Sequence, residues 1–69
     1  MYMYRSGLTM DDLLDGRSIS YAAKEINYTR GLLSNLLNRK SKCRKCRAVQ
    51  LVERFKPGED VLKYFEQVN

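Results

Sequence analysis

Apolar residues recur every three or four positions along most of the chain, and a residue that favours a helix N-cap precedes most of these runs. The pattern predicts five short helices: Thr9–Asp15, Ile19–Ile26, Arg30–Arg39, Arg44–Phe55 and a last helix that opens at Glu59 and includes Val68. The expected inward-facing residues are Leu13, Leu14, Ala22, Ala23, Ile26, Leu32, Leu33, Leu36, Leu37, Ala48, Leu51, Val52, Phe55, Val61, Leu62, Phe65 and Val68. No stretch alternates clearly with period two, so we expect an all-α fold, a compact bundle of about five short helices.

The chain has 69 residues, which is enough for one small domain, expected over residues 9–69. Residues 1–8 precede the first predicted helix and are expected as an N-terminal arm that is either ordered, part of a dimer contact or flexible. A core of this size supplies little surplus stability, so oligomerisation is a reasonable expectation.

The positive charge is concentrated in one segment. The formal net charge is +5, from 13 Lys and Arg against 8 Asp and Glu. Residues 39–47, called the basic segment below, hold Arg39, Lys40, Lys42, Arg44, Lys45 and Arg47 and no acid, while the rest of the chain has seven basic and eight acidic residues. A solvated face explains many charge runs. Six unbalanced charges repel one another, however, and a polyanion would relieve this repulsion. We therefore expect a nucleic acid as the partner.

Composition argues against several other classes of protein. Hydrophobic content of 43% and charged content of 30% suit a folded domain. No apolar run approaches the roughly 18 residues of a membrane span, and the first residues lack a signal-peptide pattern, so the cytoplasm is expected. The chain has no His, no Gly-rich phosphate loop and no acids beside an obvious nucleophile. We expect no enzyme, no catalytic residues and no cofactor.

Residues Ile19 to Asn38 match the pattern of a helix-turn-helix, in which the second helix can enter the major groove of DNA. That geometry needs small residues where the helices pass closest, a turn residue that tolerates positive φ, and apolar residues on both sides of the turn. The matching residues are Ala22, Ala23, Ile26, Asn27, Tyr28, Leu33 and Leu36. The alternative is an ordinary helical hairpin in a small bundle.

The segment from Leu8 to Val68 resembles small phage-type regulators of the Cro-like, xenobiotic-response-element class. The stretches that carry the resemblance are SISYAAKEINYTRGLLSNLLNRK, the helix around Ala48 and the closing KYFE. The chain departs from the class at three positions: Ile19 stands where the class often has Gln, and Asn27 and Arg39 stand where it often has Gly. The resemblance implies a compact helical domain that binds operator-like double-stranded DNA, often as a homodimer, in a phage or mobile element.

The exposed face of the predicted second helix of this motif supplies candidate DNA contacts. Arg30 is the best candidate for guanine, because a guanidinium can bond O6 and N7 together, and Asn35 suits adenine. The base-reading candidates are Thr29, Arg30, Gly31, Ser34 and Asn35. The phosphate-binding candidates are Ser18, Asn38, Arg39, Lys40, Lys42, Arg44 and Lys45, and Arg47 continues the strip. The alternative for Arg30 is an ion pair with Glu25 on the helix surface.

The predicted last helix offers an apolar surface for a homodimer. The expected contact residues are Val61, Tyr64, Phe65 and Val68. A competing hypothesis keeps the same fold but makes the protein a binding module for another regulator protein, such as an antirepressor, antitoxin or inhibitor. DNA binding that is both strong and specific would distinguish the first hypothesis from the second.

Cys43 and Cys46 form a C-x-x-C pair. A structural zinc site needs about four ligands, so this pair would have to be completed by a second chain. Redox pairs of this spacing usually belong to a βαβ context, which the pattern does not predict. The simplest interpretation is one packed and one exposed thiol, with Cys43 as the packed one and no metal.

Overall fold

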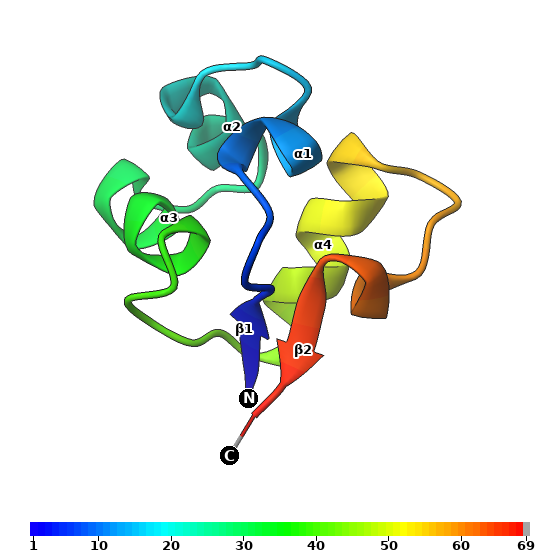
Figure 1. Cartoon of the computed structure of the whole chain (residues 1–69). Coiled ribbons are helices and arrows are strands. Elements are labelled where there is room, and N and C mark those ends of the chain that lie inside the picture. Colours follow the sequence, from blue (N-terminus) through cyan, green and yellow to red (C-terminus); the bar gives the residue numbers. More distant parts are fainter. Residues whose placement is uncertain (69) are drawn as a thin grey trace.

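The computed structural model describes residues 1–68 of the chain. These residues contain four α-helices and a two-stranded antiparallel sheet (Figure 1). In chain order the elements are β1 (Tyr2–Tyr4), α1 (Met10–Leu14), α2 (Ile19–Glu25), α3 (Arg30–Leu37), α4 (Lys45–Phe55), the 3₁₀ turn η1 (Val61–Lys63) and β2 (Phe65–Gln67). About half of these residues are helical. The fold is therefore not strictly all-α, and the described residues contain four of the five expected α-helices.

The predicted fifth helix is replaced by η1 and β2. β2 pairs with β1 in the register Tyr2↔Gln67, Met3↔Glu66 and Tyr4↔Phe65. The rings of Tyr4 and Phe65, both fully buried, pack edge to face with centroids 5.3 Å apart. Backbone pairing and the burial of two aromatic rings together favour a strand over a short terminal helix.

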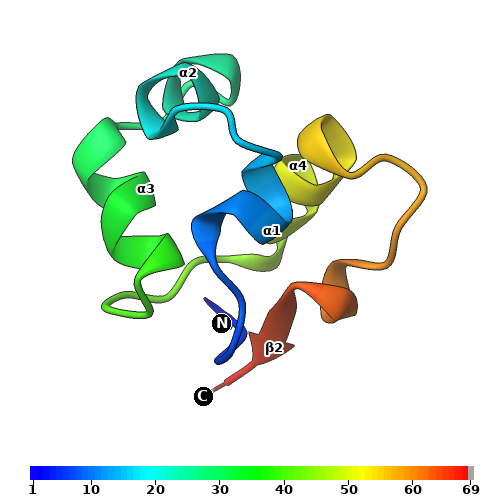
Figure 2. The ribbon, with the colours of Figure 1, turned by 45° about the horizontal axis from the view of Figure 1, so that its top comes forward.

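The N-terminal residues belong to the core. Tyr2 exchanges two backbone hydrogen bonds with Cys43, with N···O distances of 2.7 and 2.8 Å, so β1 is held between β2 and the segment before α4. Tyr2 and Tyr4 are buried and Met3 between them is half-buried, which is the alternation of a strand. The Val68 amide donates to the Met1 carbonyl at 2.8 Å, so the first and the last described residues lie side by side (Figure 2). Residues 2–4 of the predicted arm thus form the strand β1.

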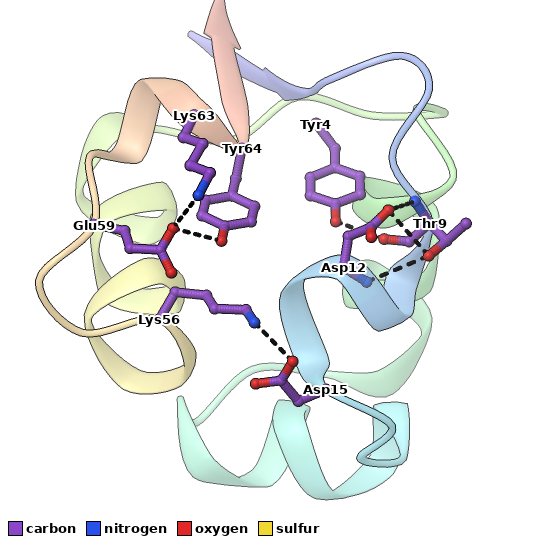
Figure 3. Close-up of polar contacts among 8 residues, drawn as sticks. All are labelled: Tyr4, Thr9, Asp12, Asp15, Lys56, Glu59, Lys63 and Tyr64. Carbon is purple, nitrogen blue, oxygen red and sulfur yellow. Dashed lines mark hydrogen bonds and ion pairs between the residues drawn. The ribbon is translucent and has the colours of Figure 1, made fainter.

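Side-chain caps define where the first three helices begin. Thr9 and Asp12 form a capping box at α1: the Asp12 amide donates to Thr9 Oγ1 at 3.3 Å, and the Thr9 amide donates to Asp12 Oδ2 at 2.6 Å (Figure 3). The Tyr4 hydroxyl donates to the Thr9 carbonyl at 2.6 Å and joins β1 to this cap. Ser18 and Thr29 cap α2 and α3 without the reciprocal bond, since their hydroxyls accept from the amides of Tyr21 and Leu32. Each such cap contributes about 1 kcal/mol.

The core positions of α2 and α3 are those that the spacing predicts, with one exception. Ala22, Ala23, Ile26, Leu33, Leu36 and Leu37 are all buried. Leu32, expected in the apolar stripe, is 47% exposed. Successive helix residues are about 100° apart, so a stripe centred on Leu33, Leu36 and Leu37 leaves Leu32 at its margin. Leu62, also expected inside, is exposed on η1.

Within residues 1–68, no helix has the length and apolar character needed to cross a membrane.

The neighbouring leucines of α3 provide a stability test. Leu33→Ala removes a fully buried side chain and should lower the free energy of unfolding by about 2–5 kcal/mol. This is a large part of the roughly 3–10 kcal/mol expected for a chain of this length. Leu32→Ala should change it by no more than about 0.5 kcal/mol. Urea denaturation followed by circular dichroism measures both, and equal losses would contradict the packing described for α3.

Stability should also fall at alkaline pH. Burial raises the pKa of the Cys43 thiol from 9.0 to about 11, and burial also raises the pKa of the Tyr4 phenol. Above about pH 9 the unfolded chain therefore releases the thiol proton while the folded chain retains it, so the free energy of unfolding decreases as pH rises. Denaturation at pH values between 8 and 10 measures this slope. The Cys43→Ala variant should show a shallower slope in this interval, and an unchanged slope would contradict the assignment to Cys43.

Candidate nucleic-acid interface

A short turn closed by backbone hydrogen bonds joins α2 to α3. The amide of Tyr28 donates to the carbonyl of Ala23 at 2.8 Å, and the amide of Asn27 donates to that of Lys24 at 3.2 Å. Asn27 has φ of 54°, in the left-handed region that this type of helix end requires. Asn27 is therefore the turn residue, as the sequence predicts. Ile26 before it is buried, and Tyr28 after it packs against the core.

The side of α3 that faces away from the core is polar and uncovered. Arg30, Gly31, Asn35 and Asn38 are exposed on this side and Ser34 is half-buried. In Figures 1 and 2, α3 lies at one edge of the molecule, and no other element covers its outer side. A Cβ atom built on Gly31 would have no neighbour within 4 Å, so the helix backbone is accessible there. Four of the predicted base-reading residues, Arg30, Gly31, Ser34 and Asn35, thus share one accessible face, with Thr29 exposed at its beginning.

Polar contacts on α2 and α3 occupy some of the candidate side chains. The Asn38 side-chain amide lies 3.4 Å from Ser34 Oγ as a donor, and Thr29 Oγ1 accepts from the Leu32 amide at 3.2 Å. The predicted alternative partner of Arg30 is engaged elsewhere: Arg54 Nε donates to Glu25 Oε1 at 3.0 Å. The Glu25 carboxylate is thus bonded from α4 rather than from Arg30.

The end of α3 gives Arg39 a structural role. α3 ends at Leu37 rather than at Arg39, and the amides of Arg39 and Lys40 close the helix by donating to carbonyls of Leu36 and Asn35, at 3.1 and 2.8 Å. This closure places Arg39 in the left-handed region, with φ of 60°, at a cost of about 1–2 kcal/mol for a residue other than Gly. Arg39 Nε donates to the Tyr4 carbonyl at 2.8 Å, and its Nη2 pairs with Glu66 at 3.3 Å. These bonds offset the cost and hold Arg39 against the sheet. The sequence analysis, which assigned Arg39 to phosphate, did not predict these bonds.

The other phosphate candidates lie at helix beginnings and in the α3–α4 loop. Ser18 is exposed at the start of α2, where its Oγ accepts from the Tyr21 amide at 3.1 Å. Lys40 and Lys42 are exposed in the loop. Arg44 is the N-cap residue of α4 without a side-chain capping bond, and Lys45 is its first residue. The first turn of α4 contains no acid. Arg44 and Lys45 therefore place only positive charge at the positive end of the helix dipole, which is unfavourable by roughly 0.3–1 kcal/mol for each cation.

The predicted dimer residues have different surroundings from those expected. Tyr64 and Phe65 are buried in the core of the chain itself, so they are not accessible to a second copy. The Tyr64 hydroxyl donates to Glu59 Oε1 at 2.9 Å, beside the Lys63–Glu59 ion pair (Figure 3). Val61 and Val68 are half-buried. Phe65 of β2 packs inside the chain, as expected for a core residue, and is therefore not part of a dimer contact.

The two cysteines differ in exposure. Cys43 is buried, Cys46 is exposed, and both thiols are free. Both line a pocket of about 250 Å³ beside Tyr28 and the start of α4. In the described part of the chain, no three side chains of His, Cys, Asp or Glu are grouped as a metal site would require. The interpretation of one packed and one exposed thiol is confirmed.

Comparison with known proteins adds no relative: a scan against protein-family models, a search of curated proteins and a search of solved structures found no match.

Gly31 offers a test of the exposed face of α3. Because Gly31 is in a helix and faces open space, Gly31→Ala should raise the free energy of unfolding by about 0.5–1 kcal/mol. Thermal denaturation measures the change. A loss of stability would contradict the open space around Gly31.

Proposed function

We propose that the protein is a sequence-specific DNA-binding transcriptional regulator that acts in the cytoplasm. In this proposal, α3 enters the major groove and the exposed cations that follow it contact phosphates. The proposal rests mainly on one observation, the uncovered polar face of α3 beside the exposed cations Arg44 and Lys45 at the start of α4, where the first helical turn contains no acidic residue. A buried or acid-balanced α3 face would not support it.

The physical argument concerns cost. Cations at the positive end of a helix destabilise the isolated protein, and the electrostatic repulsion among them adds to this. DNA phosphates remove both costs when the protein binds, because they lie beside any helix seated in the major groove. Arg30, Ser34 and Asn35 then face base edges, and the accessible backbone at Gly31 permits a close approach.

A homodimer remains part of the proposal, because a helix-turn-helix regulator reads two half-sites about one DNA turn apart. Of the expected contact residues, Val61 and Val68 keep partly exposed side chains, and Leu62 adds an exposed apolar one. A dimer would therefore use the apolar side chains Val61 and Leu62 of η1 together with Val68, which follows β2.

Leu32 favours a second candidate function, a module that binds another regulator protein. This side chain is 47% exposed and lies one helical turn from Asn35 on the margin of the same face. An apolar residue there suits a protein partner, although the same residue can contact the methyl group of thymine.

Selection from a pool of random duplexes at near-physiological salt tests the proposed function. We expect an enriched motif made of two half-sites. A pool without enrichment, in which binding is weak and disappears as salt is raised, would contradict DNA recognition and support the protein-binding module.

Two variants should separate base contacts from phosphate contacts. Arg30→Ala should lower discrimination against the wrong base by about 1–3 kcal/mol, because it removes a bidentate donor. Lys40→Ala should weaken binding to all sequences alike and reduce the slope of log affinity against log salt by about one. Titrations of selected and unrelated duplexes at several salt concentrations measure both quantities.

Lys56→Ala is the matched control, since the end of α4 lies on the other side of the molecule from α3 (Figure 1) and this lysine pairs with Asp15. It should leave both quantities unchanged. Identical behaviour of the Arg30 and Lys40 variants would contradict the division between base and phosphate contacts.

A further inference from the structure

The carbonyl group of Ile26, at the end of α2, accepts two side-chain donors from α4. Arg47 Nη1 donates to this oxygen at 2.9 Å, and Gln50 Nε2 donates to it at 3.3 Å. The backbone hydrogen bonds that close α2 use the carbonyls of Ala22, Ala23 and Lys24, so they do not use that of Ile26. The end of α2 is thus bonded to α4 through side chains.

Arg47 also contacts the residue on the other side of the turn. Its guanidinium carbon lies 4.2 Å from the centroid of the Tyr28 ring. Arg47 Nη1 donates to Gln50 Oε1 at 2.9 Å as well, which orients the guanidinium. Tyr28 directly precedes Thr29, the N-cap residue of α3. A single side chain therefore touches both residues that flank the turn residue Asn27.

Charge alone would assign Arg47 to the phosphate-binding strip, since it lies in the basic segment. Its contacts indicate otherwise: a planar guanidinium can stack on a ring and donate in its own plane at the same time, and Arg47 does both within the protein. Arg47 is only partly exposed, whereas its neighbours Arg44 and Lys45 are exposed.

We propose that Arg47 is a positioning residue: it fixes the α2–α3 turn against α4 and thereby sets the direction in which α3 meets the DNA. The proposal rests on the proposed function and extends it to a residue that need not touch DNA. A recognition helix that is displaced slightly loses base contacts, which depend on geometry, before it loses phosphate contacts, which depend mainly on charge.

Arg47→Lys and Arg47→Ala test this role, with Lys45→Ala as the matched control for a phosphate contact. Affinities for a selected duplex and an unrelated duplex are measured at several salt concentrations, under conditions where circular dichroism shows each variant to be folded. Both Arg47 variants should lower the ratio of specific to non-specific affinity by on the order of tenfold. The salt dependence should stay as in the unaltered protein. Lys45→Ala should instead reduce the salt slope by about one and leave the ratio unchanged.

A second measurement needs no DNA. Hydrogen exchange of the Asn27 and Tyr28 amides, both hydrogen-bonded in the turn, should accelerate in Arg47→Lys relative to the Asp15 amide at the end of α1. If duplex selection fails but these amides exchange faster, the proposed function is wrong and the positioning of the turn stands.

Three results would overturn the role of Arg47. One is unchanged exchange of the turn amides in the variant. Another is a loss of salt dependence in Arg47→Ala equal to that of Lys45→Ala. The third is full retention of the affinity ratio in Arg47→Lys, which would show that only the charge is needed.

Discussion

The pairing of β1 with β2 is the interaction on which the rest of the structure depends. In so small a chain the core is small, and β1 provides several of the bonds that join distant segments. Its Tyr4 packs against Phe65 of β2, donates to the Thr9 carbonyl at the start of α1, and accepts from Arg39 after α3. β1 also bonds the backbone of Cys43 just before α4. Three helices are thus placed relative to one three-residue strand.

The placement of α3 follows from restraints at both of its ends. Arg39 holds the residues after α3 against the sheet, and the turn at Asn27 is held by α4. The apolar side of the helix is filled by Leu33, Leu36 and Leu37. With both ends and one side engaged, the opposite side stays uncovered, and a polar helix face held in this way suits the groove recognition proposed above.

The sequence predicted what depends on local chemistry and missed what depends on distant partners. Thr9 and Asn27 are recognisable because a cap and a left-handed turn need particular residues within a few positions. The strand β1 has only three residues, and its partner lies at the other end of the chain, so no local pattern reveals it. The bonds of Arg39 were missed for the same reason, since its acceptors belong to β1 and β2. The accessible face of α3 was predicted, because helical spacing alone places it.

Two arginines of the basic segment make contacts within the protein. Arg39 and Arg47 each donate to a backbone carbonyl, and the several fixed donors of a guanidinium can satisfy two acceptors at once. Glu66 partly neutralises Arg39, whereas no acid lies in the first turn of α4 beside Lys45. The exposed cations Lys40, Lys42, Arg44 and Lys45 lie in the α3–α4 loop and at the start of α4, next to the end of α3. Under the proposed function, a polyanion bound there would lie beside the uncovered face of α3, so the same short segment would both orient this helix and attract its partner.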